Sequence, residues 1–192
     1  SKHSKEIAEL PGTGGELAKH LIERFELIGI TVEEAAPNTD HFDPCGLVVR
    51  LSPDNFNGRS LTAVAVAAHE VGHAMQFHRG EKIFELRKRY LPMATRLNRV
   101  GVVIMMTIPF IALLIRMPLV IGGVIALSLL LQLAGAFAYL IILPEEWDAS
   151  FNKALPVLIE GEYIEPAHMP AVRQVLKAAA LTYFAAALAN VL

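Results

Sequence analysis

Residues 117–144, MPLVIGGVIALSLLLQLAGAFAYLIILP, contain no charged side chain and decide how the rest of the chain is interpreted. A helix of about 20 apolar residues crosses the roughly 30 Å of hydrocarbon in a bilayer, so this run predicts a membrane span. Residues 91–115 are long enough for a second span if Arg96 and Arg99 extend their side chains to the headgroups. The alternative is a buried core helix, but two adjacent runs this apolar need a larger soluble shell than 192 residues supply.

Only Arg116, Met117 and Pro118 link the two runs, which predicts a tight helical hairpin whose outer ends emerge on one side of the membrane. Six basic residues lie before the hairpin or near its beginning and one lies in the link, so the positive-inside rule predicts that the outer ends face the cytoplasm. The six are Lys82, Arg87, Lys88, Arg89, Arg96 and Arg99. A third uncharged run, residues 178–192, is short of a full crossing at about 1.5 Å per residue. It predicts either a truncated span or a helix lying against the others.

The overall composition excludes several classes of protein. Hydrophobic residues make up 54% of the chain and charged residues 19%, which excludes intrinsic disorder. The net charge of -2 provides no global basic field, so we expect no nucleic-acid partner. The single cysteine, Cys45, excludes an internal disulfide and a Cys-rich zinc finger, and we expect it to be a small buried side chain.

The segment before the hairpin predicts a small soluble α+β unit. Thr13 and Glu16 form a capping box for a first helix that we expect to end at Gly29. Its apolar face comprises Leu17, Leu21, Ile22, Phe25 and Ile28. Residues 30–33 and 47–51 are strand candidates, and residues 37–46 between them, PNTDHFDPCG, are expected to form a loop. A second helix is expected to begin after the N-cap residue Ser60 and to end near His78.

This second helix contains His69-Glu70-Val71-Gly72-His73. On a helix, His69 and His73 lie one turn apart on nearly the same face, so both imidazoles can bind one tetrahedral metal ion. Glu70 lies about 100° around the helix, close enough to take a proton from a water that the metal activates. Gly72 costs about 1 kcal/mol relative to Ala in a helix, which favours a close approach of the metal or of another backbone segment at this turn. His78 is expected to point away, at the surface.

A zinc hydrolase needs a third protein ligand and one open position for water. The candidates are Glu145, Glu146 and Asp148, because the hairpin returns the chain to the side that carries the histidines. We expect Pro144 to begin a new helix there, at whose first turn carboxylates also favour the helix dipole. Helix capping is therefore the alternative role for Glu145.

Several segments together resemble the YugP-type family of bacterial membrane neutral zinc metallopeptidases. They are TGGELA, TDHFDPCGLVVRLS, SLTAVAVAAHEVGHAMQ, PEEWDAS and LKAAALTYFAAAL, in that order along the chain. The resemblance implies a gluzincin-like endopeptidase with His69 and His73 as zinc ligands and Glu70 as general base. PEEWDAS also resembles the E-aromatic-x-A-D segment of membrane metallopeptidases of the HtpX and CAAX-protease type, which points to Glu146 as the third zinc ligand. Ser150 stands where those enzymes carry Asp.

The implied fold class is α+β, a small gluzincin-like unit of helices and a short sheet interrupted by a transmembrane helical hairpin. We divide the chain into residues 1–90, the soluble part with the HEVGH helix; residues 91–143, the hairpin; and residues 144–192, the third-ligand helix and the apolar C-terminal helix. The expected function is hydrolysis of peptide bonds by a membrane-bound zinc endopeptidase whose substrate is a protein or peptide. The expected location is the bacterial inner membrane, multi-pass, with the active site on the cytoplasmic side.

Other features leave alternatives open. Tyr163, His168 and His41 are candidates for stabilising the oxyanion, and residues 47–51 could bind an extended peptide if they form an edge strand. Asp40, His41 and Asp43 match a motif of the resembled family, and a second metal site there is an open alternative. Glu70-x-x-His73 and Glu165-x-x-His168 also fit a carboxylate-bridged di-iron oxidase, although Pro166 disfavours a mid-helix ligand in the second pair. The chain could also be a non-catalytic membrane scaffold that binds zinc.

Overall fold

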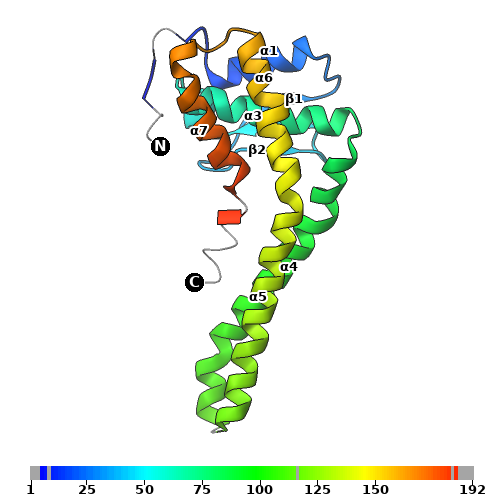
Figure 1. The fold of residues 1–192 in the computed structure, drawn as a ribbon, viewed down its shortest axis with the longest axis vertical. Helices are drawn as coiled ribbons and strands as arrows, with labels where there is room; N and C mark the ends of the chain where they lie inside the picture. Colours follow the sequence, from blue (N-terminus) through cyan, green and yellow to red (C-terminus); the bar gives the residue numbers. More distant parts are fainter. Residues whose placement is uncertain (1–4, 8–9, 116, 183, 186–192) are drawn as a thin grey trace. The chain divides into compact units, whose positions relative to one another are not determined.

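The computed structural model describes residues 5–7, 10–115, 117–182 and 184–185 (Figure 1). Arg116 in the expected link and most of the expected C-terminal helix lie outside these residues. The chain divides into two compact units. The first comprises residues 1–84 and 145–180, and the second comprises residues 85–144 and 181–192.

The first unit is α+β, mostly helical with one small sheet. Its elements are α1 (Gly14–Arg24), β1 (Thr31–Glu34), β2 (His41–Asp43), β3 (Val48–Leu51), α2 (Pro53–Phe56), α3 (Leu61–His78), the π-helix η1 (Asp148–Ala154), α6 (Leu155–Glu160), the 3-10 helix η2 (Pro166–His168) and α7 (Met169–Ala180). The strand order is β1-β3-β2, with β1 parallel and β2 antiparallel to β3. Helix α3 packs against α1, α7, η1 and the sheet. Because it is surrounded, α3 is buried over most of its circumference.

The caps of α1 and α3 agree with the sequence. Thr13 and Glu16 form both hydrogen bonds of the capping box, and the Ser60 side chain accepts a hydrogen bond from the Ala63 amide. Helix α1, however, ends at Arg24, before Gly29. Glu26 adopts a positive φ of 51° and reverses the chain, so Ile28 is 83% exposed and does not belong to the core face.

The segment expected to be a loop contains strand β2. Residues 41–43 pair with residues 48–50 of β3, and Phe42 packs against Phe77 and Phe84. This pairing makes β3 the central strand, so it has no free edge and cannot bind an extended peptide. Cys45 follows β2 in a turn and is exposed, contrary to our expectation of a buried side chain. Its backbone amide donates to the Asp43 carboxylate, which fixes the turn outside the core.

The second unit is built from the antiparallel helices α4 (Lys82–Leu114) and α5 (Pro118–Trp147). Both are long and apolar enough to cross a membrane by length and composition. Two glycines let the backbones approach closely: Gly101 lies against Ser128 and Gln132, and Gly135 lies against Ala94 and Asn98. The Ser128 hydroxyl donates a hydrogen bond of 2.8 Å to the Gly101 carbonyl. Outward-facing side chains such as Phe110, Leu119 and Phe137 are 66–87% exposed, which is unlike the core helix of a soluble protein.

Helix α5 runs through Pro144 and ends at Trp147, so Pro144 does not begin a new helix as we expected. A proline inside a helix removes one backbone hydrogen bond. The helix continues because both following residues are held by side-chain contacts, Glu145 to His73 and Glu146 to His69 and His73.

Candidate metal centre

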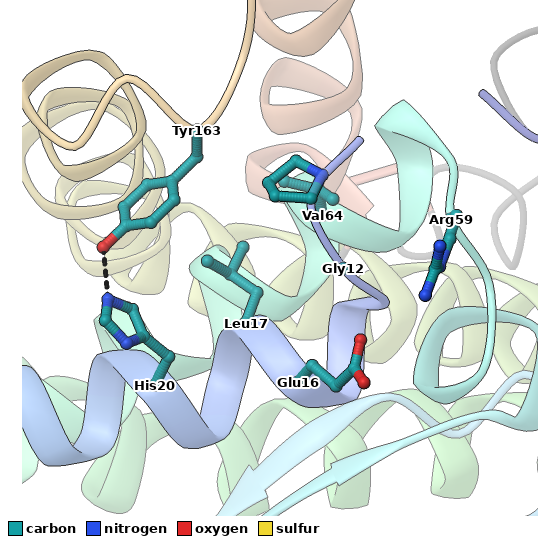
Figure 2. A pocket seen from close by; sticks show the side chains of 8 residues that line it. Gly12, Glu16, Leu17, His20, Arg59, Val64 and Tyr163 are labelled. Carbon is teal, nitrogen blue, oxygen red and sulfur yellow. Dashed lines mark hydrogen bonds between the residues drawn. The ribbon is translucent and has the colours of Figure 1, made fainter. Parts of the chain in front are cut away.

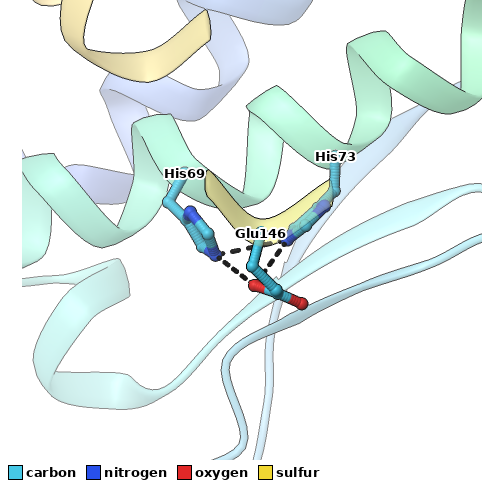
Figure 3. Close-up of side chains that lie close together, drawn as sticks. All are labelled: His69, His73 and Glu146. Atoms are coloured by element: carbon cyan, nitrogen blue, oxygen red, sulfur yellow. Dashed lines mark hydrogen bonds and ion pairs between the residues drawn. The ribbon is translucent and has the colours of Figure 1, made fainter. Parts of the chain in front are cut away.

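Helix α3 and the end of α5 bring three potential ligand atoms together (Figure 3). His69 Nε2 lies 3.2 Å from His73 Nε2, and Glu146 Oε2 lies 3.3 Å from each of them. The side chains of all three residues are at most 5% exposed. Among the described residues they form a buried His/His/Glu cluster that could hold a metal ion.

The spacing of the three atoms fits a tetrahedral metal. Ligand atoms about 2.0–2.1 Å from a tetrahedral zinc ion lie about 3.3 Å from one another. The sides of the observed triangle, 3.2–3.3 Å, agree with that value. Two imidazole nitrogens and one carboxylate oxygen are also a donor set typical of catalytic zinc sites, which leave the fourth position open. The residues present therefore fit zinc.

Each histidine is held at its other ring nitrogen. His73 Nδ1 lies 2.7 Å from Glu145 Oε1 and 3.0 Å from Gln76 Oε1. His69 Nδ1 lies 2.9 Å from Ser150 Oγ, whose hydroxyl donates to the Leu176 carbonyl at 3.1 Å. The Ser150 oxygen is then left to accept the Nδ1 proton of His69. Both Nε2 atoms are in consequence free to direct a lone pair toward a common ion.

Burial and charge act in opposite directions on His73. Burial lowers the pKa of His73, but the carboxylates of Glu146 and Glu145 raise it more, so the net pKa lies well above its usual value. Without a metal ion, a proton on His73 thus compensates part of the negative charge of the two glutamates. A metal ion would take over that role.

Gln76 connects the site to the π-helix. Its side-chain amide donates to the Glu145 carbonyl at 3.1 Å and to Asp148 Oδ2 at 2.9 Å, while its oxygen faces His73. Lys153 Nζ lies 2.9 Å from Asp148 and 3.1 Å from Glu81, which follows α3. These contacts tie η1 to Gln76 of α3 and to Glu81, just beyond the end of α3, and so help to fix where Glu145 and Ser150 lie.

Gly72 allows η1 to approach α3. A Cβ at this position would lie 2.7 Å from the carbonyl oxygen of Ala149. This confirms the expectation that Gly72 makes room for a neighbouring backbone segment. Such π-helical turns are rare and frequent at functional sites, and here the turn places Ser150 beside His69.

The remaining residues singled out in the sequence lie as follows. Glu70 is buried on α3 next to His69, and His78 is exposed as expected. The Tyr163 hydroxyl lies 2.7 Å from His20 Nε2 (Figure 2) and accepts a hydrogen bond from Arg24. His41 Nδ1 lies 2.7 Å from the Thr39 carbonyl oxygen. Asp40 accepts hydrogen bonds from Ser52 and Asn55, and Asp43 pairs with Arg50. Glu165 is the N-cap of the 3-10 helix η2 and His168 is its last residue, and neither belongs to the metal-binding cluster found among the described residues.

Sequence reasoning missed Gln76 and the contact of Glu145 with His73. Gln76 is completely buried, three residues after His73 and on the same face of α3. The spacing 69, 73, 76 of polar residues on one face of an otherwise apolar helix was the available signal.

The comparison with protein families agrees with this site. The profile of a family described as "Putative neutral zinc metallopeptidase" matches residues 1–192. The chain belongs to this family. It is also 35% identical over 192 residues to a Bacillus subtilis (strain 168) protein named "Putative membrane protease YugP", covering 98% of this chain and 80% of that protein. No solved structure matches the chain. The family name implies zinc and peptide substrates, and the His69, His73 and Glu146 cluster is a buried group that could bind such an ion.

Proposed function

We propose that the chain is a membrane-bound zinc endopeptidase of gluzincin-like architecture, with His69, His73 and Glu146 as metal ligands and Glu70 as general base. The observation that carries the proposal is the buried triangle of two imidazole nitrogens and one carboxylate oxygen, 3.2–3.3 Å on each side. The family description and the name of the relative support the same function.

When bound, zinc supplies a Lewis acid that lowers the pKa of a water ligand to about 7 and polarises the scissile carbonyl. Glu70 takes a proton from the attacking water at its carboxylate and delivers it to the nitrogen of the leaving amine. Gln76 Oε1 and Ser150 Oγ accept the Nδ1 protons of His73 and His69, and the Glu145 carboxylate lies 2.7 Å from His73 Nδ1, so neither imidazole can rotate away from the ion. Burial of these groups excludes bulk water and strengthens their interactions.

We place the protein in the bacterial inner membrane, with the α4–α5 hairpin crossing twice and the metal centre on the cytoplasmic side. The exposed apolar side chains of the hairpin and the basic residues that precede it support this arrangement. A protein or peptide substrate bound as an extended strand would have to pair with the sheet edge at β1 or β2, because β3 is central.

Replacing Glu70 tests the proposed chemistry. The full chain in lipid vesicles is expected to cleave an unfolded, fluorescently labelled polypeptide and to contain one zinc per chain by elemental analysis. Glu70→Gln is expected to retain the zinc and to lower the cleavage rate about 10²–10⁴-fold, the usual contribution of a general base. Glu160→Gln, which changes an exposed glutamate, is the matched control. Zinc binding without cleavage by the unmodified chain would instead identify a non-catalytic scaffold, and full activity of Glu70→Gln would refute the role of Glu70.

A further inference from the structure

One exposed face of α4 changes from basic to apolar at Arg99. Viewed down the helix axis, with 100° between successive residues, the side chains of this face fall within a sector of about 100°. The basic members are Lys88, Arg89, Arg96 and Arg99, all exposed. The same sector continues toward the C-terminal end of α4 with Val103, Met106 and Phe110, which are 54%, 69% and 70% exposed. Exposed basic side chains on the N-terminal side of Arg99 and exposed, mostly apolar side chains on its C-terminal side mark a boundary between two environments.

The positive charge of this face has little compensation within the hairpin. Glu85 is the only carboxylate on α4, one turn before Lys88 and Arg89, and α5 has none between residues 118 and 144. No carboxylate lies within one helical turn of Arg96 or Arg99 along α4. Among the residues that the structure describes, neither guanidinium takes part in an ion pair. Two exposed, uncompensated arginines thus stand where the apolar face begins.

We propose that Arg96 and Arg99 form a binding site for the headgroups of anionic phospholipids. The inference rests on the membrane-spanning part of the proposed function and adds a lipid partner that the endopeptidase proposal does not require. With Val103, Met106 and Phe110 in hydrocarbon, Arg99 lies at its edge and Arg96 about 4.5 Å further out, at about 1.5 Å per residue. Both positions fall within the headgroup layer, which is about 5–7 Å thick on each side.

The chemistry of the two side chains fits this partner. Guanidinium groups bind phosphate oxygens with two parallel hydrogen bonds, and a net negative headgroup adds an attraction that a zwitterionic one lacks. Lys88 and Arg89 lie about 15 Å above Arg99 along the helix, beyond the headgroup layer. They contribute only a screened, longer-range attraction. The contribution to lipid binding is therefore expected to be large at Arg96 and Arg99 and small at Lys88 and Arg89.

Lipid binding to the full chain in detergent tests the proposal. Native mass spectrometry would measure the dissociation constants of the first bound phosphatidylglycerol and of the first bound phosphatidylcholine. We expect phosphatidylglycerol to bind more tightly, and Arg96→Gln and Arg99→Gln each to weaken it about fivefold, which corresponds to about 1 kcal/mol per basic residue near a membrane surface. Lys88→Gln and Arg89→Gln are expected to change it less than twofold. Arg96→Lys and Arg99→Lys, which keep the charge, should retain most of the preference and report on folding.

Two further measurements separate the alternatives. Arg173→Gln, an exposed arginine of α7 outside the hairpin, is the matched control and should leave lipid binding unchanged. Free glycerol phosphate should bind far more weakly than phosphatidylglycerol, since the site needs the acyl chains beside Val103 and Met106. Equal binding of the two lipids, equal effects along the whole face, or equal binding of glycerol phosphate would each overturn the proposal.

The test is independent of peptidase activity. Glu70→Gln should show the same lipid preference as the unmodified chain, because the proposed lipid site does not involve the general base. If the unmodified chain cleaves the polypeptide but binds both lipids equally, the lipid site alone is rejected. If the unmodified chain prefers phosphatidylglycerol but does not cleave the polypeptide, the proposed enzyme function alone is rejected.

Discussion

Two adjacent glutamates meet opposite nitrogens of one imidazole. Glu146 lies 3.3 Å from His73 Nε2, on the side of the candidate ion, whereas Glu145 lies 2.7 Å from His73 Nδ1, on the far side. Their chemistry is the same, so the difference in role follows from position alone. Glu146 is placed to bind a metal ion, and Glu145 is placed to orient the histidine that binds it.

Exchanging each carboxylate for an amide separates these two roles. We expect Glu146→Gln to lose most of the bound zinc, because one of three protein ligands is weakened. Glu145→Gln is expected to keep one zinc per chain with an affinity 10–100-fold lower, the usual effect of changing a partner of a ligand. Zinc titration with a competing chelator measures both values. The reverse order of effects would show that Glu145 is the ligand.

The raised pKa of His73 predicts a pH dependence for the metal-free protein. The folded pKa lies above the unfolded value of about 6.5, so protonated His73 stabilises the fold fully below that pH. The stabilisation is lost as the pH rises through the folded pKa. Zinc competes with the same proton, so zinc affinity should rise over this pH range.

Thermal unfolding with a chelator present checks this expectation. The midpoint of the metal-free chain should be higher at pH 6 than at pH 9, and Glu145→Gln should show a smaller difference because one of the two carboxylates that raise the pKa is gone. A midpoint that increases from pH 6 to pH 9 would contradict the proposed charge balance.

At the scale of single residues, the sequence was informative where a motif fixes spacing. The HEVGH spacing predicts that His69 and His73 share a face, and the structure brings them together with Glu146. The choice of Glu146 over Glu145 came from resemblance, since both carboxylates follow the same span. Ser150 and Gln76 contact His69 and His73, and the contact of Ser150 depends on how η1 packs against α3. Local sequence does not encode that packing.

At the scale of elements, the close approach of η1 to α3 depends on Gly72. Gly72→Ala should push the Ala149 carbonyl away, because the new Cβ would lie 2.7 Å from its oxygen. Overpacking costs about 1–3 kcal/mol, and the better helix propensity of Ala returns about 1 kcal/mol, so we expect a net loss of stability of up to about 2 kcal/mol. Zinc affinity should fall as well, because η1 carries Ser150.

Gly123→Ala is the matched control for this substitution. A Cβ at Gly123 of α5 meets no atom within 4 Å, so helix propensity alone should act and stability should be unchanged or higher. Thermal unfolding and zinc titration of both variants make the comparison. A Gly72→Ala protein as stable as Gly123→Ala, with unchanged zinc affinity, would show that η1 does not need the glycine.

Short elements were the ones that sequence patterns did not reveal. Strand β2 has three residues within a segment rich in turn formers, and it exists because Phe42 packs on Phe77 and Phe84 while its backbone pairs with β3. The continuation of α5 through Pro144 is likewise fixed by tertiary contacts of Glu145 and Glu146. Helix α3 was predicted closely because its N-cap, Ser60, and its long apolar run lie within the segment itself.

At the scale of the whole molecule, the proposed metal centre joins distant parts of the chain. His73 and Glu146 are 73 residues apart in sequence and belong to one compact unit, while most of the residues between them form the other unit. If α4 and α5 cross the membrane, an even number of crossings is required, because an odd number would separate the histidines from Glu146. The metal site and the membrane topology are therefore linked by a condition on connectivity.

This condition can be checked with the single native cysteine. Cys45 is exposed in the first unit, so a membrane-impermeant maleimide should label it in bacterial cells only after permeabilisation if that unit is cytoplasmic. In a Cys45→Ser background, Glu160→Cys should behave in the same way, whereas Met117→Cys, between α4 and α5, should be labelled in intact cells. Labelling of Cys45 and of the Glu160 position from opposite sides would exclude the shared metal site. Labelling of both in intact cells with Met117 protected would reverse the orientation but keep the site, because the two halves of the first unit would still lie on one side.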